Sequence, residues 1–383
     1  MGAARLRKMP AAWSLLVASL AAVVACVAAA AQSDYAFVVM SDIHIGEGMP
    51  AYDGSELYSN VHAKEAIRKI NELTPEENIR LVLITGDLTD SAEEREYAVC
   101  REVLDLLDVP YSPAIGNHDV CIEHSKESCL TPHFFFLHQI KFYTDYNSSD
   151  VAEGDQTFQR TFGDLLQGEM GPGIQIAYKA PETWNSQRNI TSLFQNWVVQ
   201  IDGPSGLNLV VLDWNTRLAP FRPDYVDRGV GPWADLHDFP GGTINWLEET
   251  LPRLYTNNAS QVAFFQHHPY RLQFYAPDRI YGFDRNEKAR IQQVLRDSMP
   301  LEKYKGVFAG HLHRFYEGLA FDEEGFENFG QWETDTCKGH LMDRIPKNQY
   351  GAFTLVRVQN NLIVSIEQFS GPYYPEEPTS SFQ

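Results

Sequence analysis

The sequence predicts an α/β protein whose functional residues gather at one edge of a sheet. Apolar runs of strand length alternate with helical patterns, and the runs end in turns rich in Gly, Asp, Asn and His. The clearest example is Gly116-Asn117-His118-Asp119, which follows the apolar run 111–115. Open α/β folds bind ligands beyond the carboxyl ends of their strands, so we expect the site at these turns.

The first part of the mature chain is predicted to be a βαβαβ unit. We expect strands at 35–40, 81–85 and 111–115, and helices at 61–73 and from 91 to about 107. Ser91 and Glu94 have the spacing of a capping box at the start of the second helix.

Between residue 120 and about residue 206 the pattern loses its periodicity, while aromatic residues, Gly and Asn become frequent. We interpret this range as a large insertion that caps the site and contacts substrate. A functionally silent insertion is the alternative, and it is less expected because long loops in compact domains are usually functional or disordered.

Regular order returns in the second half of the chain. We expect strands at 209–213, 261–265 and 307–309, helices after Gly242 and at 286–299, and an antiparallel pair formed by 352–358 and 362–369. Residues 32–370 are therefore predicted to form a single domain. Residues 371–383, rich in Pro, Glu and Ser, are predicted to be a loose tail.

Residues 1–31 are predicted to be a secretory signal peptide. Arg5, Arg7 and Lys8 precede an apolar run that ends in small residues. The run is about long enough to span a bilayer, so an uncleaved membrane anchor is the main alternative. A lipoprotein signal acylated at Cys26 is a third interpretation.

The mature chain is acidic. Without the three basic residues of the signal segment, 28 Lys and Arg stand against 51 Asp and Glu, a net charge of −23. This charge argues against nucleic acid or an anionic membrane as a bulk partner. A small anionic substrate is compatible with it, because bound cations dominate the field of a local site.

Four cysteines follow the signal segment: Cys100, Cys121, Cys129 and Cys337. In an exported chain this number predicts two disulfides, and Cys121–Cys129 is the favoured pair because the two flank a short loop. Three Asn-x-Ser/Thr sequons are candidate glycosylation sites, at Asn147, Asn189 and Asn258.

Five strand-end turns carry residues that can ligate metals: Asp42-x-His44, Gly86-Asp87, Gly116-Asn117-His118-Asp119, His267-His268 and Gly310-His311-x-His313. Asp42 and His44 lie two residues apart, so in extended backbone both side chains point to one side. A carboxylate and an imidazole placed together make half of a divalent-metal site. The other histidines are expected to be polar residues near the surface: His62, His124, His133, His138, His237 and His340.

These turns, in this order and each after an apolar run, resemble the calcineurin-like metallophosphoesterase superfamily over most of residues 35–370. Gly-Asn-His-Asp and Gly-His-x-His are the most specific blocks. The resemblance implies a four-layer αββα sandwich of two mixed sheets, with two metal ions at one rim. It assigns the first metal to Asp42, His44 and His313, the second to Asn117, His267 and His311, and both to a bridging Asp87.

The mixture of oxygen and imidazole ligands suits Fe, Mn or Zn better than Ca. Two such ions clamp the attacking and leaving oxygens of a phosphoryl group, and a hydroxide bridging them is the implied nucleophile. The resemblance makes His118 the residue that assists the leaving group and Asp90 the residue that orients His118.

Two adjacent histidines follow the expected strand at 261–265, and their side chains should point to opposite sides. Pro269 restricts His268 to extended backbone, which keeps the two side chains apart. Family members with one histidine in this block place it two residues before the proline, which matches His267. We therefore expect His267 to ligate metal, and His268 to touch substrate or lie beside the site.

Departures from the family patterns narrow the expected activity. Asp90 stands where purple acid phosphatases carry a tyrosine ligand, and Asp119 stands where Ser/Thr protein phosphatases use glutamate. The stretches 209–213 and 267–269 look like the branch that holds cyclic-nucleotide and other phosphodiesterases. We expect a secreted phosphodiesterase of a small phosphate ester. The alternatives are a phosphomonoesterase on nucleotides or phosphoproteins and an inactive binding scaffold.

Overall fold

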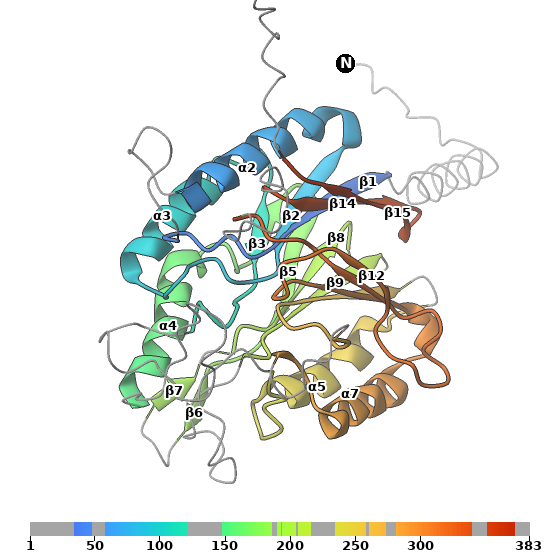
Figure 1. Cartoon of the computed structure of the whole chain (residues 1–383). Helices are drawn as coiled ribbons and strands as arrows, with labels where there is room; N and C mark the ends of the chain where they lie inside the picture. Colours follow the sequence, from blue (N-terminus) through green and yellow to red (C-terminus); the bar gives the residue numbers. More distant parts are fainter. Residues whose placement is uncertain are drawn as a thin grey trace, which may run out of the picture.

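The computed structural model describes residues 34–47, 58–120, 148–185, 190–192, 194–203, 206–215, 234–257, 260–272, 281–338 and 351–371 (Figure 1). Two β-sheets lie at the centre of the molecule and helices lie outside them.

The first sheet has five strands in the order β15-β14-β1-β2-β3. They are β1 (Tyr35–Met40), β2 (Ile79–Ile84), β3 (Tyr111–Pro113), β14 (Phe353–Gln359) and β15 (Leu362–Phe369). The strands β1, β2 and β3 run parallel and are connected through α2 (Tyr58–Glu77) and α3 (Glu94–Leu104), which confirms the βαβαβ unit. The pair β14–β15 is antiparallel and extends the other edge.

The second sheet has eight strands in the order β12-β13-β11-β10-β9-β8-β5-β4. They are β4 (Glu169–Gly171), β5 (Ile174–Lys179), β8 (Trp197–Ile201), β9 (Leu207–Leu212), β10 (Gln261–Gln266), β11 (Tyr304–Ala309), β12 (Tyr316–Leu319) and β13 (Gly330–Glu333). Four neighbours, β9, β10, β11 and β13, run parallel, and antiparallel strands flank them.

The remaining elements lie around this sheet. They are α4 (Ser148–Phe162), α5 (Thr243–Leu254), α7 (Arg285–Ser298), the 3-10 turn η1 (Leu301–Lys303), and a separate pair formed by β6 (Thr183–Asn185) and β7 (Ile190–Ser192).

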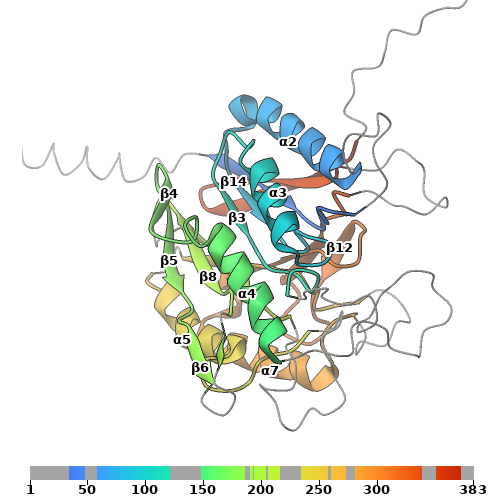
Figure 2. The ribbon, with the colours of Figure 1, turned by 90° about the vertical axis from the view of Figure 1, so that its left-hand side faces the viewer.

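The two sheets pack face to face. The ring of Phe37 on β1 meets Phe265 on β10 and Phe308 on β11 edge-on, with centroids 5.7 and 5.9 Å apart. Burying each of these rings contributes roughly 1.5–3 kcal/mol. The helices α2 and α3 cover the first sheet, and α5 and α7 cover the second (Figures 1 and 2). The predicted sandwich of two mixed sheets is confirmed.

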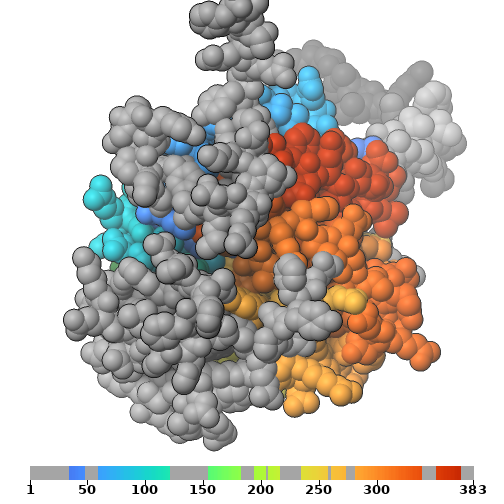
Figure 3. Space-filling model, viewed as in Figure 1, coloured from blue at the N-terminus to red at the C-terminus, as the bar shows by residue number. Residues whose placement is uncertain are grey.

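On the face shown in Figure 3, the red strands β14 and β15 lie directly above orange residues of the second sheet region. The strands β14 and β15 therefore lie beside the second sheet at this edge, where the hydroxyl oxygens of Thr354 on β14 and of Thr334, just after β13, are 3.0 Å apart.

The start of α3 differs from the expected capping box. The N-cap is Glu93, and its partner is Glu96 rather than Glu94. Ser91 instead donates from its backbone N–H and its hydroxyl to the Glu96 carboxylate, at 2.9 and 3.0 Å. The reason is the backbone of Ala92, whose φ of 56° interrupts any helix that begins at Ser91.

The range 120–206 differs from the expected capping insertion in most of its described part, the separate pair β6–β7 excepted. The strands β4, β5 and β8 continue the second sheet. In α4, Phe158 and Phe162 are buried in the main core, where both contact Tyr97 of α3. These segments build the sandwich itself, and their strands alternate too briefly to be recognised in sequence. Residues 121–147 lie outside the described residues.

Several predictions fall on residues that are not described. The signal segment 1–31, the pair Cys121–Cys129, and the three sequon residues Asn147, Asn189 and Asn258 belong to this group, as does all but the first residue of the tail 371–383. Of the other two cysteines, Cys100 and Cys337 are both buried free thiols. Among the helices that the structure describes, none has the length and apolarity needed to cross a bilayer.

Candidate metal centre

The five strand-end turns meet at one rim of the sandwich. Asp42 and His44 follow β1, Asp87 follows β2, Asn117 and His118 follow β3, His267 follows β10, and His311 and His313 follow β11. Because β1, β2 and β3 are parallel, and β10 and β11 are parallel, their carboxyl ends point the same way within each sheet. The sandwich then places both sets of ends side by side.

The first cluster contains Asp42, His44, Asp87 and His313, whose ligand atoms lie within 4.8 Å of one another. His313 Nε2 is 3.2 Å from Asp42 Oδ1, and His44 Nε2 is 3.5 Å from Asp87 Oδ2. The two Nε2 atoms of His44 and His313 are 3.3 Å apart.

The second cluster contains Asp87, His267 and His311. His267 Nε2 lies 3.2 Å from Asp87 Oδ2, 3.0 Å from His311 Nδ1 and 2.9 Å from Asn117 Oδ1. Asp87 therefore belongs to both clusters, and its role as a bridge between two ions stays a prediction.

The donor set fits two divalent cations. In each cluster two imidazole nitrogens from distant parts of the chain face each other within 3.3 Å, an arrangement that brings two lone pairs to one point. Carboxylate oxygens complete the first set, and the Asp87 carboxylate and the Asn117 amide oxygen complete the second. Neutral imidazole with carboxylate oxygen is typical of Zn, Mn and Fe sites. Asp42, His44 and His313 would hold one ion, Asn117, His267 and His311 the other, and Asp87 both.

The backbone at this rim is strained. Five of these residues have positive φ: Asp42 (50°), His44 (47°), Asp87 (50°), His311 (73°) and His313 (50°). Such conformations cost of order 1–3 kcal/mol each and gather at functional sites. Hydrogen bonds hold them in place: His311 N–H donates to both Asp42 oxygens, and Thr336 Oγ1 donates to the Asp42 carbonyl.

Charge at the second cluster is shared between Asp87 and His267. Burial opposes ionisation of both, but the His267 imidazole holds the pKa of Asp87 well below its usual range. In turn, despite burial, the Asp87 carboxylate raises the pKa of His267 to about 9. Burial and the His267 charge lower the pKa of His311 to about 3, so His311 is neutral and free to ligate.

His118 lies at the open side of the first cluster. Its side chain is 36% exposed, whereas those of His44 and His267 are 1% exposed. Its ring centroid is 4.6 Å from that of His44. Its pKa is raised, because Asp87 and Asp90 outweigh the opposing effect of burial. A histidine that keeps its proton near neutral pH can serve as a general acid.

The group that orients His118 differs from the expected carboxylate. His118 Nδ1 lies 2.6 Å from the backbone carbonyl oxygen of Asp90 and 3.9 Å from its carboxylate. The carbonyl accepts the Nδ1 proton, which leaves Nε2 to face a substrate. The Asp90 carboxylate is closer to His44 Nδ1, at 3.5 Å.

Asp119 is a site residue whose role the sequence motif did not reveal. Its buried carboxylate accepts from the backbone N–H groups of Leu88, Thr89 and Gly116, and from the Thr89 hydroxyl. These bonds tie the turn after β2 to the turn after β3. A Cβ on Gly116 would lie 2.1 Å from the backbone nitrogen of Asp87, so only glycine permits this approach.

His268 is buried beside the second cluster. Its ring centroid is 4.7 Å from that of His311 and 5.2 Å from that of His267. It is absent from the groups of ligand atoms that converge. The geometry thus brings His267 into the second cluster and leaves His268 adjacent to it.

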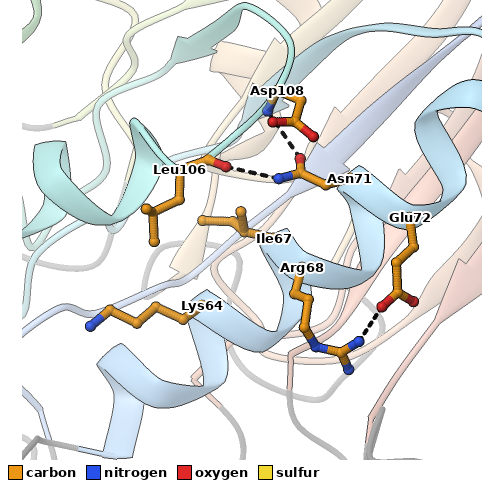
Figure 4. Close-up of a pocket in the computed structure, with 7 residues that line it drawn as sticks. All are labelled: Lys64, Ile67, Arg68, Asn71, Glu72, Leu106 and Asp108. Atoms are coloured by element: carbon orange, nitrogen blue, oxygen red, sulfur yellow. Dashed lines mark hydrogen bonds and ion pairs between the residues drawn. The ribbon is translucent and has the colours of Figure 1, made fainter.

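A groove on another face of the molecule has a different character (Figure 4). It has a volume of about 410 Å³ and lies between α2 and the segment after α3, lined by Lys64, Ile67, Arg68, Asn71, Glu72, Leu106 and Asp108. Asn71 bridges it by donating to the Leu106 carbonyl and accepting from Asp108 N–H. None of its residues contributes to the metal clusters.

Comparison with known proteins agrees with this geometry. A family model described as calcineurin-like phosphoesterase matches residues 35–315. A relative from Arcobacter nitrofigilis, named probable glycerophosphodiester phosphodiesterase GpdQ, is 39% identical over 83 residues, which are 21% of this chain and 29% of that protein. The match thus spans less than a third of the relative's length.

Two solved structures of phosphatases align with most of this chain. A dimetal phosphatase from Danio rerio aligns over 88% of this chain and 98% of its own, with 13% identity and a TM-score of 0.48. A purple acid phosphatase from yellow lupin aligns over 88% of this chain and 54% of its own, with 12% identity and a TM-score of 0.45.

Proposed function

This chain belongs to the calcineurin-like phosphoesterase family, and we propose that it is an exported phosphodiesterase that uses two metal ions. Family membership makes it a hydrolase of phosphoric esters. The proposal adds the preference for diesters, the roles of individual residues and the location.

The observation that carries the proposal is the placement of His118. It is the most exposed of the described histidines at the rim, it lies against His44, and the Asp90 carbonyl fixes its tautomer. Its backbone N–H donates to Asp87 Oδ1 at 2.9 Å, so its position follows that of the bridging carboxylate. An ester bound at the metals would present its leaving oxygen to this imidazole.

The residues then divide the work. When bound, the metal ions supply Lewis-acid activation of the phosphoryl group and of water. Asp87 would hold both ions through its one carboxylate. Protonated His118 gives its Nε2 proton to the departing oxygen, which is worth about 10²–10⁴-fold in rate. The buried walls formed by His267 and His311 exclude bulk water and strengthen these electrostatic effects.

The preference for diesters is supported by the Arcobacter relative, which is named as a probable glycerophosphodiester phosphodiesterase. The missing tyrosine ligand at position 90 also separates this chain from the purple acid phosphatases. His118 would assist either class of ester, because diesters and monoesters of alcohols and phenols leave as the same oxyanions of high pKa.

A direct test compares a bis-aryl phosphate with the matching mono-aryl phosphate, using protein loaded with Mn or Zn. We expect the diester to have the higher kcat/KM, and His118→Ala to lower it while metal content stays normal. Faster hydrolysis of the monoester would make the chain a phosphomonoesterase. No turnover of either ester by protein that holds two metals per chain would make it an inactive scaffold.

Export is supported by the basic start and the apolar run within residues 1–31. Expression with a C-terminal tag in a secreting host tests it: we expect tagged protein in the medium whose N-terminus begins near residue 32. Protein of full length that stays with the membrane fraction would instead make residues 1–31 an anchor.

A further inference from the structure

A buried polar network lies at the carboxyl end of β9, outside the metal clusters. Its members are Asn196, Asp213, Asn215, His237 and Thr243, and all five are at most 1% exposed. His237 thus differs from the surface histidine that the sequence suggested. Its backbone is strained, with φ at 49°, and its N–H donates to Asp235 Oδ1 at 2.8 Å.

The hydrogen bonds of the Thr243 hydroxyl show which groups in this network donate and which accept. Its hydroxyl proton goes to the Asp213 carbonyl oxygen, which can only accept, at 2.6 Å. Asn196 Oδ1 accepts from Asp213 N–H, which settles the orientation of that amide, and Asn196 Nδ2 then donates to Thr243 Oγ1 at 3.1 Å. The Thr243 oxygen therefore has one lone pair left and no proton to give.

Both ring nitrogens of His237 face acceptors. Nδ1 lies 3.1 Å from Thr243 Oγ1, and Nε2 lies 2.9 Å from the Asn215 carbonyl oxygen. A neutral imidazole has one N–H and one lone pair, so either tautomer would aim a lone pair at an oxygen lone pair. Only the imidazolium, with two N–H donors, satisfies both contacts.

The surroundings of His237 suit a cation. The Phe194 ring centroid is 4.4 Å from the His237 ring centroid, within the range of cation–π attraction, and the Phe239 centroid is 6.2 Å away. Among the residues that the structure describes, the charged groups on the neighbouring segments are Asp213 at the end of β9, Asp235 beside His237 in sequence, and Asp238, which pairs with Arg290 of α7. The N-terminus of α5, which begins at Thr243, opposes the charge.

The network reaches the catalytic turn through one residue. The Asn215 side-chain amide donates to the Ile115 carbonyl oxygen at 2.7 Å, and the same amide donates to Asp213 Oδ1 at 2.9 Å. Ile115 directly precedes Gly116-Asn117-His118. His237 therefore fixes the Asn215 backbone, and Asn215 fixes the start of the turn that carries His118.

We propose that His237 is held as a buried imidazolium and is a positioning residue for the turn that carries Asn117 and His118. Loss of its second proton sets one lone pair against an oxygen and releases Asn215 from the turn. The effect on turnover rests on the proposed function, whereas the protonation state of His237 stands by itself.

Nuclear magnetic resonance of the full chain, labelled with ¹⁵N-histidine and loaded with metal, tests the protonation state. The His237 signals are those missing from His237→Gln, or, if that variant does not fold, those displaced by Thr243→Ser. We expect two protonated ring nitrogens at pH 7, above the ordinary midpoint of about 6.5 for histidine. A neutral ring at pH 7 would overturn the proposal.

Thr243→Val tests the link to the turn, because it removes the acceptor for Nδ1–H. We expect His237 to lose its second proton about 1–2 pH units lower, the size of one hydrogen bond to a charged group. Turnover of a bis-aryl phosphate should fall about tenfold in kcat with KM and metal content kept. Thr243→Ser should restore both, and Thr250→Val, at another buried threonine of α5, should change neither.

The outcomes separate the two proposals. A shifted titration with unchanged kcat in Thr243→Val would refute the positioning role. An enzyme without activity on any phosphoric diester would refute the proposed function, and the ¹⁵N spectra would still decide whether His237 is an imidazolium.

Discussion

The two halves of the metal centre use the same residue types in different surroundings. The first half-site (Asp42, His44 and His313) lies beside the exposed groups of the rim: the side chains of His313, His118 and Asp90 are 27%, 36% and 37% exposed. In the second half-site (Asn117, His267 and His311), Asn117 is half-buried and both histidines are at most 9% exposed.

This difference in exposure indicates which half-site meets substrate. Substrate and solvent reach the centre from the side of the first half-site, where His118 can move a proton. The second half-site is enclosed by His268 and Tyr281, whose rings lie 4.7 and 5.8 Å from the ring of His311. We expect the enclosed half to hold its ion more firmly and the open half to exchange with added metal.

Asp87→Asn should disable both half-sites, because the carboxylate that it removes serves both of them. We expect both ions to be lost and turnover to fall to background. Metal analysis alongside a bis-aryl phosphate assay checks this result. Two ions retained together with normal turnover would contradict the bridging role.

His118→Ala should affect the open half alone. We expect two ions per chain and a loss of about 10²–10⁴-fold in kcat. The loss should shrink for a nitrophenolate leaving group, which needs little protonation. Equal losses for good and poor leaving groups would show that His118 does not act as the acid.

His267→Ala and His268→Ala sharpen the boundary of the enclosed half. We expect His267→Ala to weaken binding of one ion by at least ~10²-fold, since a ligand costs more than the groups that orient it. His268→Ala should bind both ions and slow turnover only modestly. If metal content falls in His268→Ala and not in His267→Ala, the ligand is His268.

The two half-sites should differ in how strongly their affinity for metal depends on pH, because protons compete with metal for the histidines of metal-free protein. Because the pKa of His267 is raised to about 9, an ion entering the enclosed half must displace a proton. Its apparent affinity should rise about tenfold per pH unit between pH 6 and 9. Burial places the pKa of His44 well below its usual value, so the open half should depend less steeply on pH. Calorimetric titrations at several pH values measure both slopes, and equal slopes would refute the assignment.

The same shift has a consequence for stability. A raised pKa means that the folded state binds the His267 proton more tightly than the unfolded chain does. The stabilisation is complete below pH 6.5 and is lost as pH rises through about 9. Metal-free protein should therefore melt at lower temperature at pH 9 than at pH 6.

Asp90→Asn is expected to have the smallest effect. The backbone carbonyl of residue 90 holds His118 and survives the substitution. We expect less than a tenfold loss in kcat. The pKa of His118 should fall, because the Asp90 charge helps to raise it. A loss as large as that of His118→Ala would show that the carboxylate orients the ring directly.

The residues at the rim of this site could be predicted from the sequence because they directly follow apolar strands. Asp42, Asp87 and His311 could be placed from one pattern, a buried run that ends in a polar turn. It missed the role of Asp119, because four donors from two separate turns converge on that carboxylate only in the folded chain. It also missed the imidazolium contacts of His237, which join β9, α5 and the turn after β3.

We expect turnover to require two metal ions held by seven residues: Asp42, His44, Asp87, Asn117, His267, His311 and His313. The most direct measurement removes all metal with a chelator, adds Mn or Zn back stepwise, and follows bound metal and bis-aryl phosphate turnover in the same samples. We expect no turnover without metal and full turnover at two ions per chain. Undiminished hydrolysis by metal-free protein, or full activity at one ion per chain, would contradict the claim.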